Sequence, residues 1–103
     1  MAEQILQINF KFNVSAAEYR KLAHEIAGAF AEVEGLRWKV WILNEQEKEA
    51  GGIYLFNDEQ SLGAFVASPL AAQVKGHPAL SEFSAKAFAV EHEATTITRG
   101  PIS

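Results

Sequence analysis

The sequence predicts one α+β domain whose elements follow the order β-α-β-β-α-β. Two observations carry this prediction. Apolar residues alternate with a period of two in several segments, and they recur every three or four residues in others. The first period is typical of strands and the second of helices. The order is that of a ferredoxin-like domain with an antiparallel sheet. At 103 residues the chain has the length for one hydrophobic core, so we expect a single domain over residues 1–103.

The first strand and the first helix have the most regular patterns. Residues 5–12 alternate strictly, and the apolar side chains of one face are Leu6, Ile8, Phe10 and Phe12. Ser15 and Glu18 have the spacing of a capping box, which satisfies free amide groups at a helix start. The stripe of the predicted helix is Tyr19, Leu22, Ala23, Ile26, Phe30 and Val33. Gly35 suits the left-handed residue that ends such a helix.

A hairpin is expected next. Residues 36–43 read as the second strand, 44–49 as a polar loop and 52–56 as the third strand. The pair Gly51–Gly52 indicates a bulge or a close approach by another backbone or a ligand.

The second half of the chain predicts helices and a last strand. Asn57 or Asp58 can cap a second helix with the stripe Leu62, Phe65 and Val66. Ser68–Pro69 predicts a fresh short helix that runs to about Lys75 and is broken at residues 76–78. Residues 82–90 alternate as a fourth strand. In the polar tail, residues 95–98 are expected to form a short edge strand or to lie on a partner.

Both faces of the predicted sheet carry large apolar groups. In one assignment the side chains facing the helices are Leu6, Ile8, Phe10, Trp38, Val40, Ile42, Ile53 and Leu55. Those left uncovered are then Ile5, Trp41, Leu43, Tyr54 and Phe56. The pattern does not fix which face is which. Because two helices cover only one face, and burying an aromatic side chain contributes roughly 1.5–3 kcal/mol, both faces need cover. A homodimer packed sheet on sheet provides it.

Composition excludes several classes of function. The net charge is -4 without a basic stripe, which disfavours nucleic-acid binding. With no cysteine, the chain has neither disulfides nor a catalytic thiolate. His24, His77 and His92 lack the spacing of metal ligands, so no metal site is expected. No phosphate loop or serine nucleophile motif is present. There is no signal-peptide pattern and no membrane-spanning apolar run, so we expect a cytoplasmic protein without a membrane partner.

The remaining candidates for a functional site are a group of aromatic residues. Its members are Phe10, Phe12, Trp38, Trp41, Tyr54 and Phe56. They indicate either ordinary core and dimer interface or an apolar pocket for a flat organic molecule. In the second case Asn9, Lys39, Tyr54 or an indole NH would orient the molecule. His77 is either a loop residue or an acid or base at the pocket rim.

Four stretches together resemble the YdhR-like monooxygenases of bacteria. The stretches are residues 6–13, Gly35-Leu36 with Trp38-Lys39-Val40-Trp41, residues 49–56, and Asp58-Glu59. This family belongs to the dimeric α/β-barrel group, in which two ferredoxin-like protomers pack sheet against sheet. The resemblance implies a role like that of antibiotic-biosynthesis monooxygenases, which oxidise phenols or quinols with oxygen and need no metal or flavin.

The resemblance thus implies a cofactor-independent monooxygenase for a small aromatic substrate. The catalytic candidates are Asn9, Tyr54 and Lys39; the substrate-binding candidates are Phe10, Phe12, Trp38, Trp41, Phe56 and His77. Asn9 and Tyr54 would hold the substrate's oxygen atoms, Trp38 and Trp41 would sandwich its ring, and Lys39 would stabilise the phenolate. Haem-degrading relatives use Asn, Trp and His; Phe56 in place of their Trp disfavours that activity. The alternatives are a non-catalytic small-molecule-binding or stress-related dimer, and an interaction module without a ligand.

Overall fold

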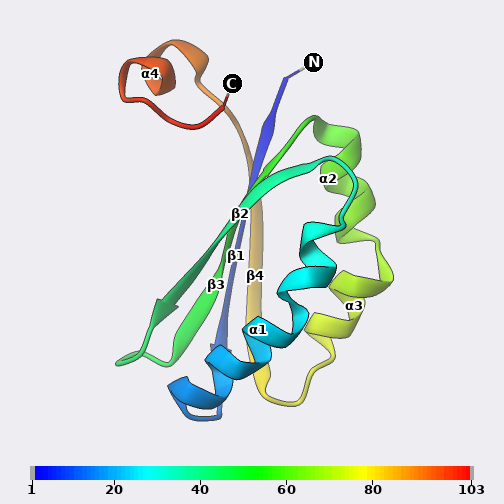
Figure 1. Ribbon diagram of the computed structural model, residues 1–103, viewed down its shortest axis with the longest axis vertical. Helices are drawn as coiled ribbons and strands as arrows, with labels where there is room; N and C mark the ends of the chain where they lie inside the picture. The colour runs from blue at the N-terminus through cyan, green and yellow to red at the C-terminus, as the bar shows by residue number, and fades with distance from the viewer. Residues whose placement is uncertain (1, 103) are drawn as a thin grey trace.

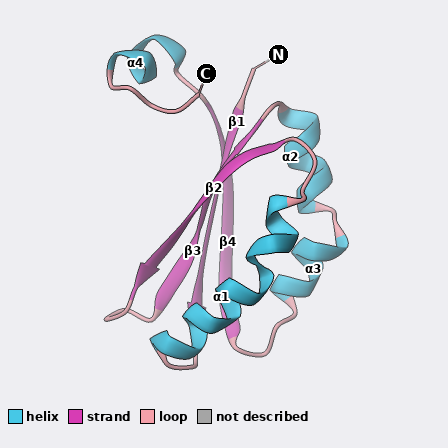
Figure 2. Cartoon of the chain, viewed as in Figure 1, coloured by secondary structure: helices cyan, strands magenta, loops and turns pink. Residues whose placement is uncertain are grey.

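Four antiparallel strands form one sheet in the order β2-β3-β1-β4, and three helices cover one of its faces (Figures 1 and 2). The computed structural model describes residues 2–102. The elements are β1 (Gln4–Phe12), α1 (Ala16–Ala31), β2 (Leu36–Asn44), β3 (Glu49–Phe56), α2 (Glu59–Val66), α3 (Pro69–Lys75), β4 (Leu80–Ala89) and α4 (His92–Ile97). The predicted β-α-β-β-α-β order is present, with α2 and α3 together in place of the second helix.

Side-chain caps start the three covering helices where the sequence predicts. Ser15 Oγ accepts a hydrogen bond from the Glu18 amide at 3.1 Å. Asp58 Oδ1 accepts one from the Ser61 amide at 2.7 Å, and Ser68 Oγ one from the Ala71 amide at 3.2 Å. Each cap satisfies an amide that has no partner inside its helix.

Gly35 does not end α1, contrary to the prediction. The helix ends at Ala31 with Glu32 as its C-cap, and Gly35 adopts a φ of 83° in the turn that enters β2. A Cβ atom at Gly35 would lie 2.2 Å from Ser61 Oγ. Glycine is therefore required because the turn packs directly against α2.

Two further boundaries differ from the prediction. β3 begins at Glu49 rather than at residue 52, because Lys48, with a φ of 53°, completes a tight turn. The tail forms helix α4 rather than an edge strand, since the Glu91 side chain accepts a hydrogen bond from the Ala94 amide and caps it. α4 lies beside the chain termini, away from the other helices (Figure 1).

Strand register decides which side chains face the helices. Tyr54 pairs with Leu6 on one side and with Lys39 on the other, so these three residues share the covered face. Trp41 pairs with Gly52 and lies on the same face. The assignment that placed residues 38, 40, 42, 53 and 55 with Leu6 against the helices is therefore wrong. Those residues lie on the opposite, open face.

The glycine pair of β3 confirms the predicted close approach. A Cβ atom at Gly51 would lie 1.9 Å from the carbonyl oxygen of Ile8 on β1. The two strand backbones pass too closely here for any larger residue.

The open face keeps an exposed apolar surface. Val40 and Phe88 are 52% and 45% exposed on it. At one end the tail folds back over it, where Trp38 Nε1 donates a hydrogen bond to the Pro101 carbonyl at 2.8 Å. Within residues 2–102, no helix has the length and hydropathy needed to cross a bilayer.

Candidate functional site

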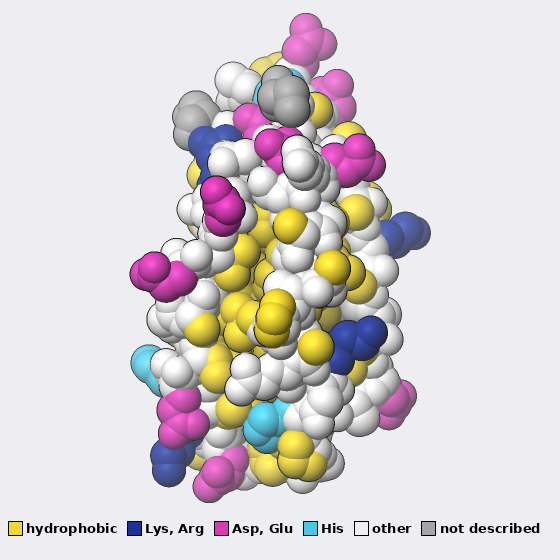
Figure 3. Space-filling model, turned by 90° about the vertical axis from the view of Figure 1, so that its right-hand side faces the viewer, with side chains coloured by type: hydrophobic (Ala, Val, Ile, Leu, Met, Phe, Trp, Pro, Cys, Tyr) yellow, Lys and Arg dark blue, Asp and Glu magenta, His cyan; other side chains and the backbone are white. Residues whose placement is uncertain are grey.

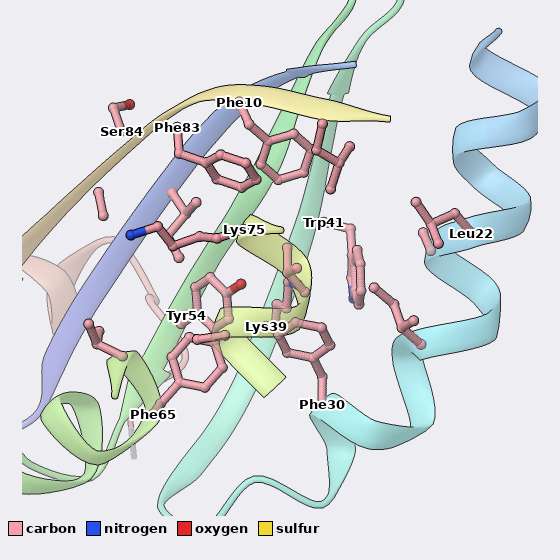
Figure 4. A pocket seen from close by; sticks show the side chains of 18 of the residues that line it. Phe10, Leu22, Phe30, Lys39, Trp41, Tyr54, Phe65, Lys75, Phe83 and Ser84 are labelled. Atoms are coloured by element: carbon pink, nitrogen blue, oxygen red, sulfur yellow. The ribbon is translucent and has the colours of Figure 1, made fainter. Parts of the chain in front are cut away.

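A cavity of about 260 Å³ lies between the covered face of the sheet and the helices α1, α2 and α3 (Figure 4). Its lining from the sheet is Ile8, Phe10, Lys39, Trp41, Tyr54, Leu80, Phe83, Ser84 and Ala85. Its lining from the helices is Tyr19, Leu22, Ala23, Ile26, Phe30, Phe65, Val66, Ala71, Val74 and Lys75. An engineered apolar cavity of about 150 Å³ binds benzene. The volume here therefore suits a molecule of one or two rings.

Lys39 presents its amine to an aromatic cage on the cavity wall. Its Nζ lies 3.3 Å from the ring centre of Trp41, 3.6 Å from that of Phe30 and 4.7 Å from that of Tyr54. The faces of these rings attract a cation. Among the cavity-lining residues there is no carboxylate, so no acidic side chain balances this charge.

Burial of Lys39 changes its protonation. Removal of water from around the ammonium lowers the pKa of Lys39 to about 7. At neutral pH the amine is therefore present in both its neutral and its protonated form. A group that exchanges a proton near the working pH is suited to acid–base chemistry.

Gly52 makes the space that Lys39 occupies. It lies beside Lys39 on the covered face, and a Cβ atom at this position would come within 2.6 Å of Lys39 Cε and 3.1 Å of Tyr54 Cε1. The missing side chain lets the lysine lie flat on the sheet. At Gly52, the group that approaches the backbone closely is therefore the Lys39 side chain of the protein itself.

Two tyrosines, Tyr19 and Tyr54, line the cavity. The Tyr54 hydroxyl points into it (Figure 4). Tyr19, on α1, is 5% exposed, and its hydroxyl has no hydrogen-bond partner among the described residues. Burial raises the pKa of both tyrosines, so both stay protonated and can donate hydrogen bonds at neutral pH. Leaving the Tyr19 hydroxyl buried without a partner costs about 1–3 kcal/mol.

The rim of the cavity lies on the helix side of the molecule. Figure 3 shows this side, with hydrophobic side chains gathered in its middle and charged side chains toward its margins. Lys75 and Ser84 are exposed side chains of the lining.

Four of the predicted site residues line the cavity: Phe10, Lys39, Trp41 and Tyr54. Phe12 and Phe56 are 3% and 0% exposed and belong to the packed core on either side of it. His77 lies between α3 and β4, where its Nδ1 accepts a hydrogen bond from the Ala79 amide at 3.1 Å. It therefore stabilises the turn and does not reach the cavity.

Asn9 and Trp38 do not share a pocket with Tyr54, and the prediction that they would is wrong. Asn9 pairs with Gly51, and Trp38 with Leu55, so both side chains lie on the open face. There Asn9 accepts a hydrogen bond from Gln7 Nε2 at 3.0 Å. Alternate residues of a strand point to opposite faces, which separates Asn9 from Phe10 and Trp38 from Lys39.

Tyr19 is a cavity residue that the sequence reasoning missed. Its place in the helix stripe identified it as apolar core. The sequence did contain a signal that could have identified Tyr19, because a tyrosine in a buried stripe carries a hydroxyl that needs a hydrogen-bond partner.

The sequence as a whole matches a known family. Residues 5–101 match the model of the family described as "Putative mono-oxygenase ydhR". The chain belongs to this family. Among curated proteins, none matches the sequence significantly. The family assignment, and with it the resemblance seen in the sequence, rests on nearly the whole chain.

Solved structures with low sequence identity share the fold. SnoaB, a cofactor-independent oxygenase from Streptomyces nogalater, is 17% identical with a TM-score of 0.71 over 87% of this chain and 94% of that one. The protein NE2512 of unknown function from Nitrosomonas europaea is 14% identical with a TM-score of 0.73, over 88% and 91%. The haem-degrader MhuD from Mycobacterium tuberculosis, solved with two haems, is 18% identical with a TM-score of 0.66, over 84% and 95%. These likenesses confirm the ferredoxin-like α+β fold.

The cavity offers nitrogen and hydroxyl donors rather than a set of metal ligands. Within residues 2–102 there is no group of three or more histidine, aspartate or glutamate side chains close enough to hold a metal ion. The chemistry that the described side chains themselves provide is proton transfer by Lys39, hydrogen bonding by Tyr54 and stacking by aromatic rings.

Proposed function

We propose that the protein is a cofactor-independent mono-oxygenase that oxidises a small phenol or quinol inside the cavity. The observation that carries the proposal is the caged Lys39 amine at the wall of an otherwise apolar cavity. The family assignment supports an oxygenase, and SnoaB offers a structural neighbour that works without a cofactor.

The reaction balances without an external reductant when the substrate supplies all the electrons. A phenol whose para carbon carries hydrogen reacts with one molecule of oxygen to give a quinone and one molecule of water. One oxygen atom becomes the new carbonyl and the other leaves as water. The substrate loses four electrons, and oxygen gains them.

Lys39 acts first as a base and then as an acid. Its neutral amine accepts the phenol proton, and the ammonium that forms stabilises the phenolate. The phenolate gives one electron to oxygen, and the two radicals combine at the para carbon to form a peroxide anion. Lys39 protonates this peroxide. The amine then takes the para hydrogen as a proton while the O–O bond breaks, and the departing hydroxide receives that proton as it becomes water.

The aromatic and hydroxyl groups orient the substrate. Tyr54 donates a hydrogen bond to a substrate oxygen atom, and Trp41 packs against the substrate ring. The apolar lining, with Ile8 and Phe10 on the sheet, excludes water and so strengthens the interaction between Lys39 and the phenolate. Asn9 and Trp38 have no part in this mechanism because they lie on the open face.

A homodimer is part of the proposal. Val40 and Phe88 remain about half exposed at the open face, and Trp38, Ile42 and Ile53 are partly exposed there. A contiguous apolar surface of this kind on a sheet is typical of an interface. A second copy packed on it would bury these side chains, in agreement with the dimeric barrel that the family resemblance implies.

Oxygen uptake by metal-free protein tests the function. With a panel of quinols and phenols we expect consumption above the spontaneous rate, and an at least hundredfold loss in Lys39→Met. Trp38→Phe is the matched control, because it changes an aromatic residue of the same strand that lies outside the cavity. Tryptophan quenching by the panel without oxygen uptake would instead indicate a binding protein.

A further inference from the structure

We propose that Lys39 is also the nucleophile of a covalent site for aromatic aldehydes, with which it condenses to an imine inside the cavity. The reaction joins the Lys39 nitrogen to the aldehyde carbon. The carbonyl oxygen leaves as water with the two hydrogens of the neutral amine, and no net proton is gained or lost. No oxidant takes part, so this site is independent of the oxygenase proposal.

The position of the amine favours such a reaction. Nζ lies between the rings of Phe30 and Trp41, with Tyr54 on a third side, and it borders the cavity on the side left open. Other protein side chains do not compete for it, because no ion pair or hydrogen bond of Lys39 is found among the described residues. The other polar side chains that reach the cavity are Tyr54, whose hydroxyl points into it, and Lys75 at the rim (Figure 4).

The cavity selects the kind of aldehyde. Its walls are apolar side chains, so a ring is favoured over a hydrated, sugar-like aldehyde. Imine formation also removes an amine that carries charge half of the time and puts a neutral group in its place. The cost of keeping an ammonium away from water then disappears. The Tyr54 hydroxyl, which points into the same space, can donate a hydrogen bond to the aldehyde oxygen as it leaves (Figure 4).

Its lowered pKa makes Lys39 a better nucleophile at neutral pH than the other lysines of the chain. With a pKa of about 7, half of Lys39 is neutral at pH 7. An ordinary lysine, with a pKa of about 10.4, is neutral to less than about 0.1% at that pH. Only the neutral amine attacks a carbonyl, and buried lysines of this kind are used in proteins to form imines.

Reductive trapping tests the proposal. The full-length protein is incubated at pH 7 with 2-naphthaldehyde and sodium cyanoborohydride, without oxygen, and the labelled lysines are mapped by peptide mass spectrometry. We expect Lys39 to be labelled at least tenfold faster than Lys75, which borders the same cavity but is exposed. Glyceraldehyde, a hydrophilic aldehyde, should show no preference for Lys39.

Variants and competition separate the possible outcomes. Lys75→Gln should keep the preferred label, and Lys39→Met should lose it. Wild-type mapping answers the question even if Lys39→Met does not fold. Labelling of all lysines at similar rates, or labelling of Lys75 alone, would overturn the proposal. Because the experiment excludes oxygen, strong Lys39 labelling together with absent oxygen uptake would retain the covalent site and reject the oxygenase.

Discussion

The Nζ atom of Lys39 lies 3.3 Å from the ring centre of Trp41, two residues further along the same strand. Both side chains project from β2 toward the helices, while Trp38, on the same strand, projects to the open face. The protein therefore carries one tryptophan that senses the charge of Lys39 and one that does not.

Tryptophan fluorescence should report the titration of Lys39. We expect the emission of Trp41 to change with a midpoint near pH 7, because the cation over its ring is lost as Lys39 deprotonates. Trp38→Phe should keep the transition, and Trp41→Phe and Lys39→Met should abolish it. His24 lines the groove on the other side of Trp41, so His24→Gln is a required control. A transition that survives in Lys39→Met would assign the signal to another group.

Stability should increase with pH above neutrality. Between about pH 7 and pH 10 the unfolded chain binds a proton at Lys39 that the folded chain does not, so the free energy of unfolding rises with pH. We expect a rise on the order of 2 kcal/mol from pH 7 to pH 9.5, less than the full linkage value because Lys39 is partly exposed. Urea unfolding at several pH values measures it.

The same measurement has an internal check. Lys39→Met should lack the rise, whereas Lys75→Met should keep it. Above about pH 10 the stability of the wild type should fall, because the raised pKa of Tyr19 and Tyr54 favours the unfolded chain, where tyrosines ionise more readily. Parallel curves for wild type and Lys39→Met would show that Lys39 is not desolvated.

Gly52→Ala should displace Lys39 from its cage. The new methyl group would come within 2.6 Å of Lys39 Cε, so the flexible lysine must move. We expect the fluorescence transition to weaken or shift and oxygen uptake to fall at least tenfold. Gly63→Ala is the matched control, because nothing lies within 4 Å of its added methyl group. That change should raise the free energy of unfolding by about 0.5–1 kcal/mol through helix propensity in α2.

Tyr19→Phe should stabilise the protein and leave substrate binding unchanged. Removing a buried hydroxyl without a partner should raise the free energy of unfolding by about 1 kcal/mol. Because this hydroxyl is closed off from the cavity, KM for the phenol should not change. Thermal unfolding and steady-state kinetics provide the two readings. A raised KM would show that the hydroxyl reaches the substrate.

The proposed dimer makes a separate prediction. Val40→Glu places a charge on the open face and should give a monomer by size-exclusion chromatography with light scattering. Val66→Glu is the control, because Val66 is equally exposed at 52% but lies on α2. A wild-type protein that elutes as a monomer at micromolar concentration would reject the interface.

Local chemistry explains what could be predicted from the sequence. The alternation of β1 and the caps at Ser15, Asp58 and Ser68 depend on residues within four positions, and the structure contains all of them. The predicted element boundaries were wrong at Lys48 and at Gly35, where the conformation of a turn, rather than the spacing of apolar residues, determines where the element begins or ends.

The face assignment depended on information that a single strand does not contain. A register shift between Leu36 and Trp38 places Leu36 and Lys39 on the covered face, and pairing across strands then fixes Tyr54 beside Lys39. Sequence alone thus named three aromatic residues of the cavity, Phe10, Trp41 and Tyr54. It also named Asn9 and Trp38, whose side chains lie on the other face of the sheet. Lys39 was named as a candidate, yet its aromatic cage becomes visible only in three dimensions.

The position of Lys39 on β2 has a consequence for assembly. β2 is an outer strand of the sheet, so its free backbone groups can accept a strand from another molecule. A strand paired with the β2 edge would cover the side of the aromatic cage and remove the remaining water from around the Lys39 ammonium. A charged side chain turned inward on an outer strand is a device by which natural sheets resist such growth into fibres. Lys39, the group proposed here to react, would therefore also disfavour polymerisation along the β2 edge, and the proposed dimer uses the open face of the sheet instead.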